Sequence, residues 1–237
     1  MTPYHPVVHH SAATNLEPLD VLGPDGRSTG VVKARGKVHE DGDWHRAIHI
    51  WVVQQERYVL LQRRSRDKEL EPLRLDVSVG GHLRAGETLL DALREAEEEL
   101  GLELRPGQVE YLGTAVSERR YPGHEPPLLD REHQDVYVVR DDRPLQAYRL
   151  QASEVDTLYE VPLEKAIALF EAGEPVAAAG YDSMRRPSDA LLYAADLPSQ
   201  GREVHLEALR RVAAYLRGEG APDIARRPFG VYTPADV

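Results

Sequence analysis

Apolar and β-branched runs along the first half of the chain predict a series of strands. The runs "HRAIHIWVV" and "RYVLLQRRS" are separated by the polar "QQE", which predicts a hairpin. "LRLDVSV" is a third run of this kind, and further strands are expected near "QVEYLGTAVSE" and "HQDVYVVRD". Upstream, "LEPLDVLGPDGRSTGVVKA" predicts a short N-terminal hairpin with a Gly-Pro-Asp-Gly turn.

Three segments repeat their apolar residues with the period of a helix. In residues 88–101 a narrow apolar stripe is formed by Leu89, Leu93, Ala96 and Leu100. Thr88 and Asp91 are suited to cap the start of this helix, and Gly101 is suited to end it. "PLEKAIALFEAGE" and "GREVHLEALRRVAAYLRGEG" predict two later helices. Strands mixed with helices, but too few helices for a regular βαβ series, predict an α/β fold with a mixed β-sheet sandwiched between helices.

The same pattern divides the chain into four parts. Residues 1–15 lack periodicity and are expected to form a flexible arm. Residues 16–175 hold the predicted sheet and make the main domain. Residues 176–220 form a C-terminal extension with one long helix, packed on that domain, and residues 221–237 are a polar tail with no clear element.

Composition narrows the range of functions. The chain of 237 residues has no cysteine, which excludes disulfides, thiolate nucleophiles and Cys-ligated metal sites. Its net charge of −11 argues against nucleic acid or an anionic membrane as a partner, whereas a metal site can still attract a small phosphorylated substrate. Basic clusters in "LLQRRSRDKEL" and "SERRY" are interpreted as exposed loop charge. Because no apolar run approaches the roughly 18–20 residues of a membrane span and the N-terminus lacks a signal pattern, we expect a cytoplasmic protein.

The helix predicted in residues 88–101 carries an acidic face. Glu95, Glu98 and Glu99 are spaced i, i+3 and i+4, so they share a face away from the apolar stripe. Their mutual repulsion costs about a few tenths of a kcal/mol per pair. A solvated acidic surface is the simplest interpretation. The alternative is a divalent-cation site, because Mg²⁺ prefers carboxylate oxygens, water and phosphate as ligands.

The spacing around these glutamates favours the metal site. Residues 94–102, "REAEEELGL", match the pattern R-E-U-x-E-E-x-G-U, in which U is aliphatic, and Gly81 and Glu87 match the G-x5-E that precedes it. This resembles the signature of the Nudix superfamily, which hydrolyses nucleoside diphosphates linked to another moiety. The chain departs from the pattern by having six residues instead of seven between Glu87 and Arg94. The resemblance implies the Nudix fold, here with an N-terminal β-hairpin and a C-terminal helical extension.

The resemblance also implies roles for individual residues. The implied ligands of Mg²⁺ or Mn²⁺ are Glu95, Glu98 and Glu99. The implied catalytic residues are Glu98, Glu95, Arg94 and Glu132, and the implied substrate-binding residues are Gly80, Gly81 and His82. Bound metal would offset the charge of a pyrophosphate and would orient and acidify a water.

Glu132 is a candidate because "LDREHQDVYVV" resembles the N-E-F-x-x-V-Y segment of some Nudix members, from which a further metal ligand or base comes. The alternative is an ordinary exposed acid in a loop. Glu118 and Asp130 are weaker candidates of the same sort.

One branch of the superfamily offers a rival function. The segment "PLDVLGPDGRSTGVVKARGKVHEDGDWHRAIHIWVV" resembles the N-terminal region of type I isopentenyl-diphosphate isomerase and the hydrolases related to it. That isomerase uses histidines as metal ligands, and the residues that fall where its histidines would lie are His39, His45 and His82. Each is also an ordinary structural residue for a strand end or loop. The isomerase needs a cysteine in a segment resembling "VCGH", where this chain has Gly80, so hydrolysis is favoured over isomerisation.

The expected function is therefore that of a Mg²⁺-dependent pyrophosphohydrolase acting on a nucleoside diphosphate derivative, such as a nucleoside di- or triphosphate or a nucleotide sugar. An isomerase-like protein and a non-catalytic nucleotide-binding module stay open as alternatives. The aromatic residues considered for stacking on a base are Trp44, Trp51, Tyr58 and Tyr121, although aromatic residues on strands commonly belong to a core. Because Nudix proteins are often dimers, the resemblance also implies a homodimer.

Overall fold

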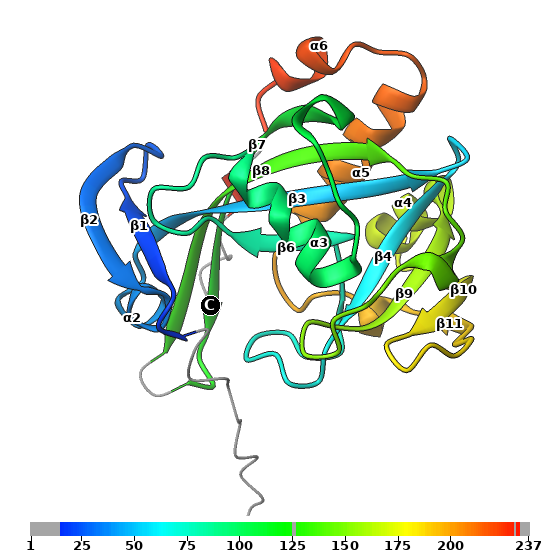
Figure 1. The fold of residues 1–237 in the computed structure, drawn as a ribbon, viewed down its shortest axis with the longest axis horizontal. Helices are drawn as coiled ribbons and strands as arrows, with labels where there is room; N and C mark the ends of the chain where they lie inside the picture. Colours follow the sequence, from blue (N-terminus) through cyan, green and yellow to red (C-terminus); the bar gives the residue numbers. More distant parts are fainter. Residues whose placement is uncertain (1–14, 125–126, 230, 233–237) are drawn as a thin grey trace, which may run out of the picture.

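The structure is a computed structural model that describes residues 15–124, 127–229 and 231–232. Its central feature is one large mixed β-sheet (Figure 1). Its strands are β1 (Pro18–Leu22), β2 (Ser28–Ala34), β3 (Trp44–Gln54), β4 (Tyr58–Arg64), β5 (Leu75–Asp76), β6 (Val79–His82), β7 (Val109–Tyr121), β8 (Leu128–Arg140), β9 (Val155–Pro162), β10 (Val176–Asp182), β11 (Ala190–Leu192) and β12 (Val231–Tyr232). The main path runs β11-β10-β9-β4-β3-β8-β7-β12. β1 and β6 also pair with β3, β2 pairs with β1, and β5 pairs with β4.

Helices cover both faces of this sheet. They are α2 (Arg35–Asp41), α3 (Arg94–Leu100), α4 (Leu163–Ala172), α5 (Arg202–Leu216) and α6 (Ala221–Ala225). In Figure 1, α3 lies in front of the central strands, and α4 and α5 lie behind them. No helix in the described part of the chain is long and apolar enough to cross a membrane.

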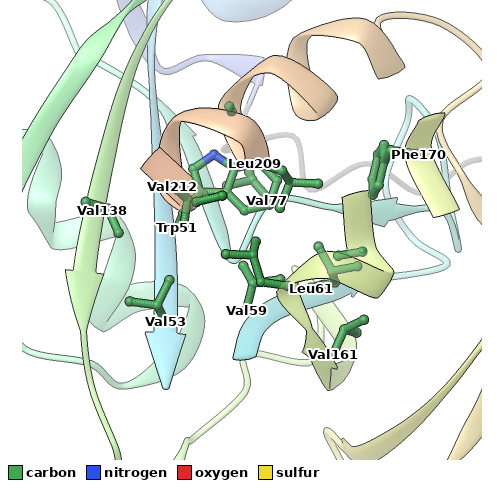
Figure 2. Close-up of a cluster of buried hydrophobic side chains, with 14 of the residues drawn as sticks. Trp51, Val53, Val59, Leu61, Val77, Val138, Val161, Phe170, Leu209 and Val212 are labelled. Atoms are coloured by element: carbon green, nitrogen blue, oxygen red, sulfur yellow. The ribbon is translucent and has the colours of Figure 1, made fainter. Parts of the chain in front are cut away.

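The central strand β3 supplies side chains to two hydrophobic cores, because successive residues of a strand point to opposite faces. Ile48, Ile50 and Val52 belong to the core under α3. Trp51 and Val53 belong to the other core, which includes Phe170 of α4 together with Leu209 and Val212 of α5 (Figure 2). The predicted α/β fold, with a mixed sheet between helices, is therefore confirmed.

Both predicted hairpins are present, since β1 pairs antiparallel with β2, and β3 with β4. The third predicted strand is instead divided into β5 and β6. Between them, the Ser78 hydroxyl accepts a hydrogen bond from the Val52 N–H (2.9 Å) and donates one to the Leu60 carbonyl (2.5 Å). The Ser78 hydroxyl thus occupies backbone groups of β3 and β4 that would otherwise form hydrogen bonds between strands.

The acidic helix is shorter than the sequence predicts. The α-helix begins at Arg94 and is preceded by a 3₁₀ turn, Asp91–Leu93. Thr88 and Asp91 do form the reciprocal capping bonds, with the Thr88 N–H donating to Asp91 Oδ2 (2.8 Å) and the Asp91 N–H to Thr88 Oγ1 (3.3 Å). These bonds fix the start of the 3₁₀ turn. Gly101 ends α3 at φ 63°, as predicted.

The C-terminal third is integrated into the fold. β10 continues the sheet beside β9, and α5 contributes to the hydrophobic core. The described part of the expected tail contains α6 and β12, and β12 pairs parallel with β7. Arg211 on α5 links this segment to β7, because its guanidinium donates to the carbonyls of Ile224 and Pro228 in the segment and to the carbonyl of Leu112 on β7. The arm predicted for residues 1–15 lies outside the described residues except for Asn15.

Candidate active site

A cavity of about 660 Å³ opens where β3, β4 and β6 meet α3. Most of the predicted site residues line it, namely Gly80, Gly81, His82, Glu95, Glu98, Glu99 and Glu132. Strand pairing explains this convergence, because β6 and β8 both pair with β3 and α3 packs against β6. Gly81 and Glu132, which lie far apart in the sequence, are thereby brought to one site.

The carboxylates of α3 differ in burial. Glu99 is buried and accepts hydrogen bonds from Gln62 Nε2 (3.2 Å) and the Gly80 N–H (3.3 Å). Burial raises the pKa of Glu99 to about 8. Burial also raises the pKa of Glu95 to about 7, with Arg94 opposing and Glu98 adding to the effect. Because a nearby cation would relieve the cost of charging these two acids, their environment fits a divalent-metal site.

Arg94 connects these carboxylates to Glu87. Its Nε and Nη2 donate to Glu87 at 2.8 and 3.0 Å, and its Nη1 donates to Glu95 (2.5 Å) and Glu98 (3.1 Å). Six residues suffice between Glu87 and Arg94, because the 3₁₀ turn Asp91–Leu93 rises about 2.0 Å per residue instead of about 1.5 Å in an α-helix. The shortened spacing therefore retains the contact between Glu87 and Arg94.

The two glycines before the cavity bring the backbone close to the acidic helix. A Cβ atom on Gly81 would lie 2.6 Å from Glu95 Oε2, so a larger residue would displace that carboxylate. Gly80 donates its N–H to Glu99 (3.3 Å), and a Cβ there would lie 3.2 Å from Val77 Cγ1. Both glycines thus support the carboxylates in addition to lining the cavity.

Three histidines and one aspartate converge beside the acidic helix. The group whose ligand atoms all lie within 4.8 Å of one another consists of His39, His45, His82 and Asp130, and it is the one such group found among the described residues. Each member comes from a different element, respectively α2, β3, β6 and β8. The helix α2, which positions His39, was not expected from the sequence, because residues 35–41 lack an apolar repeat long enough to indicate a helix.

The chemistry of this histidine group fits a metal ion. Within the described part of the chain, His39 Nε2, His45 Nε2 and Asp130 Oδ1 are buried without a hydrogen-bond partner. Buried polar atoms rarely lack a partner, so three such atoms in one place fit a site for an ion. Burial holds the pKa of His39 well below its ordinary value and lowers that of His82 to about 3. Neutral imidazoles are the form that ligates metals.

Glu132 lies against the same group and is not the exposed loop acid considered as an alternative. It is buried, its Oε1 lies 3.2 Å from His82 Nε2, and its Oε2 accepts hydrogen bonds from Arg119 and Gln134. Burial tends to raise the pKa of Glu132, but Arg119 and His82 outweigh this and hold it well below its usual range. Of the two weaker candidates, Asp130 joins the histidine group, whereas Glu118 pairs with Arg131 (2.6 Å).

The sequence analysis did not predict the cationic side chains that line this cavity. The arginines and lysine that line the cavity are Arg35, Arg64, Lys68, Arg84 and Arg119. Three of them belong to the basic clusters interpreted as exposed loop charge, and that interpretation is wrong for these three. For Arg64 and Arg119, a usable signal was their position at the end of a predicted strand. Of the four aromatic residues considered for base stacking, Tyr121 lines the cavity and Trp51 lies in the core.

Comparison with known proteins identifies the family. The model of the NUDIX domain matches residues 43–181. Nudix hydrolase 3 of Arabidopsis thaliana is 42% identical over 153 residues, which cover 63% of this chain and 20% of that protein. An uncharacterized Nudix hydrolase of Clostridium acetobutylicum is 33% identical over 150 residues, 62% of this chain and 70% of the relative.

One solved structure is similar in fold to this chain. The crystal structure of the Deinococcus radiodurans protein DR0079 superposes with a TM-score of 0.53 at 25% identity, covering 67% of this chain and 91% of that one. This chain spans only a fifth of the Arabidopsis relative. The family match covers most of the sheet, α3 and α4, and it includes Glu95, Glu98, Glu99 and Glu132 of the cavity. The chain therefore belongs to the NUDIX domain family.

Proposed function

We propose that this protein is a divalent-metal-dependent pyrophosphohydrolase that cleaves a phosphoanhydride bond in a nucleoside diphosphate derivative. The observation that carries the proposal is the placement of the α3 carboxylates and several cationic side chains around one cavity. Carboxylates hold Mg²⁺ or Mn²⁺, and guanidinium and ammonium groups bind phosphate oxygens. A pyrophosphate needs both kinds of partner.

The α3 residues have distinct proposed roles. Glu95, Glu98 and Glu99 would hold the Mg²⁺ or Mn²⁺, which when bound supplies charge neutralisation and an acidified water. Arg94 orients Glu95 and Glu98 through its hydrogen bonds to both. Glu98 is proposed as the general base, because its side chain is 48% exposed and thus reachable by water. Glu132 is a poorer base, because its pKa is held well below the range that suits proton abstraction near neutral pH.

The phosphate-binding role is assigned to Arg64 and Lys68. Both line the cavity, at the end of β4 and in the loop that follows it. Lys68 lies close enough to Glu99 to oppose the rise of its pKa, so cation and carboxylate face the same space. Arg64 and Lys68 each pair with one carboxylate, Asp76 (2.6 Å) and Glu154 respectively, whereas Arg119 pairs with two, Asp130 (2.9 Å) and Glu132.

A second metal centre is proposed at His39, His45, His82 and Asp130. The three buried atoms without a partner favour it. Imidazole and carboxylate together suit Zn²⁺ or Mn²⁺. Isomerase chemistry is not proposed with it, because Gly80 offers no side chain that can carry a proton and the chain has no cysteine to replace it.

The test is product formation by the full chain, followed by chromatographic separation of the phosphorylated products, with Mg²⁺ and with EDTA, across nucleotides, nucleotide sugars, dinucleoside polyphosphates and isopentenyl diphosphate. We expect metal-dependent hydrolysis of one substrate class. The variant Glu98→Gln serves as a control for contaminating phosphatase and should lose at least about a hundredfold in turnover while its circular dichroism is unchanged. Ligand binding without turnover of any substrate would instead support the non-catalytic module.

A further inference from the structure

The cavity is not built from the family domain alone. Pro198 and His205 line it, although both lie beyond residue 181, where the family match ends. From this we infer that His205 of α5 is a positioning residue for substrate, which fixes Asp76 and through it the guanidinium of Arg64. The inference rests on the phosphate-binding role proposed for Arg64. It makes the C-terminal extension part of the active site.

A chain of hydrogen bonds joins the three residues. His205 Nε2 lies 2.8 Å from Asp76 Oδ1, and Arg64 Nη1 donates to Asp76 Oδ2 at 2.6 Å. The Val77 N–H donates to Asp76 Oδ1 as well (2.8 Å), so both oxygens of this carboxylate have fixed partners. Arg64 is further held by its Nε, which donates to the Leu70 carbonyl (3.2 Å). The guanidinium is therefore oriented from two sides.

The contacts of His205 make it a donor to Asp76. Its Nδ1 lies 3.3 Å from the Gly201 carbonyl, which can only accept a hydrogen bond. A charged Asp76 likewise only accepts. A doubly protonated imidazole satisfies both partners at once, and a neutral ring protonated at Nε2 satisfies the shorter contact. In either form the proton on Nε2 points to the carboxylate that holds Arg64.

The ring of His205 has little freedom to move. Its side chain is 3% exposed, and it stacks on Phe170 at 5.5 Å with an interplanar angle of 12°. Trp51 packs against it edge-on, at 6.0 Å and 85°. A polar ring in such surroundings costs free energy unless it is hydrogen-bonded. An apolar residue would pack as well, so the histidine is explained by its bond to Asp76.

The segment that leads into α5 is fastened to the elements that carry the cavity's cations. Gln200 bonds to both backbone groups of Arg120, at 3.0 Å to the N–H and 2.5 Å to the carbonyl. Asp196 pairs with Arg63 (3.0 Å), next to Arg64 on β4. Ser199 bonds through its N–H to Glu71 (3.2 Å), in the loop that contains Lys68. This segment therefore fixes the position of His205 relative to the phosphate-binding side chains.

The experiment measures the binding of methylenediphosphonate with Mg²⁺ by calorimetry. This probe carries two phosphoryl groups but no cleavable bridging oxygen. We expect His205→Phe, which keeps an aromatic ring but no donor, to bind about tenfold more weakly than the natural chain. His205→Gln retains a donor and should recover most of the affinity. Arg210→Gln, which removes an exposed residue of α5 paired with Glu171, is the control and should bind unchanged.

Substrate kinetics and stability separate positioning from a structural role. Positioning predicts that His205→Phe raises KM about tenfold and leaves kcat within about threefold, and that His205→Gln restores most of the KM. Equal losses in His205→Phe and His205→Gln, accompanied by a lower melting temperature, would overturn the inference. Unchanged binding by His205→Phe, or no binding by the natural chain, would overturn it too. If His205→Phe does not fold, Asp76→Asn must weaken probe binding to the same extent.

The two proposals fail in different ways. If the variants alter probe binding as expected but the natural chain hydrolyses no substrate, the proposed function is wrong and the assignment of His205 stands. If the natural chain hydrolyses a substrate and His205→Phe changes neither KM nor probe binding, the assignment of His205 is wrong and the function stands.

Discussion

Arg94 and Glu87 are joined by two parallel hydrogen bonds, from Nε at 2.8 Å and from Nη2 at 3.0 Å. A paired arrangement of this kind fixes the plane of the guanidinium as well as its position. The third nitrogen of Arg94, Nη1, can then hold Glu95 and Glu98 together. Glu87 thus orients the acidic face of α3 without lining the cavity.

Glu87→Gln should therefore impair catalysis through Arg94. The amide keeps the shape of the side chain but accepts only one of the two bonds, so the orientation of Glu95 and Glu98 is loosened. We expect kcat/KM to fall about 10- to 100-fold at saturating Mg²⁺, with the fold intact. The matched control is Glu97→Gln, the same chemical change on the exposed side of α3, which should stay within about twofold. Equal activity of the two variants would show that Arg94 is held by other contacts.

Gly81→Ala tests how closely the backbone must approach the acidic helix. The new methyl group would lie 2.6 Å from Glu95 Oε2, so that carboxylate has to move. We expect the Mg²⁺ concentration for half-maximal activity to rise about tenfold or more. Gly107→Ala is the control, because a Cβ there meets open space. A normal Mg²⁺ requirement in Gly81→Ala would argue against Glu95 as a metal ligand.

Metal content tests the histidine group independently of activity. After exposure to Mn²⁺ or Zn²⁺ and dialysis, His45→Gln should retain one metal ion fewer per chain than the natural protein, as measured by plasma mass spectrometry. Metal at about 100 times its Kd should also stabilise the natural chain by about 2.7 kcal/mol and this variant by less. His133→Gln, on the same sheet but outside the group, should behave as the natural chain. Identical metal content in all three proteins would remove the second centre.

Features set by residues close together in the sequence could be predicted, whereas contacts between residues far apart in the sequence could not. Hairpins, the Gly101 helix end and the acidic face of α3 depend on neighbours within a few positions, and their patterns are legible in the sequence. His205 and Asp76 are 129 positions apart, and no local pattern links them. Arg119 looked like an exposed loop charge because the register between β7 and β8, which places it at the cavity, cannot be read from its own segment. α2 was missed because it is short and held by packing of a single buried apolar residue, Val38.

Asp76 should make stability depend on pH. Burial tends to raise its pKa, but the hydrogen bond from His205 and the charge of Arg64 outweigh this and hold the pKa well below the ordinary value of 3.8. In the unfolded chain the same group takes up a proton at about pH 3.9. A carboxyl group with a depressed pKa in the folded state contributes stability that is fully present above the unfolded pKa and is lost as the pH falls toward the folded pKa.

Asp76→Asn removes this contribution and leaves Arg64 partly unpaired. At pH 7 we expect the variant to have a free energy of unfolding about 3 kcal/mol lower than that of the natural chain, as measured by urea titration. The gap should narrow between pH 4 and pH 3, because only the natural chain gives up stability there. Asp223→Asn, which breaks an exposed pair with Arg226, should match the natural chain at every pH. A gap that stays constant from pH 7 to pH 3 would mean that Asp76 acts through packing and that its charge does not stabilise the fold.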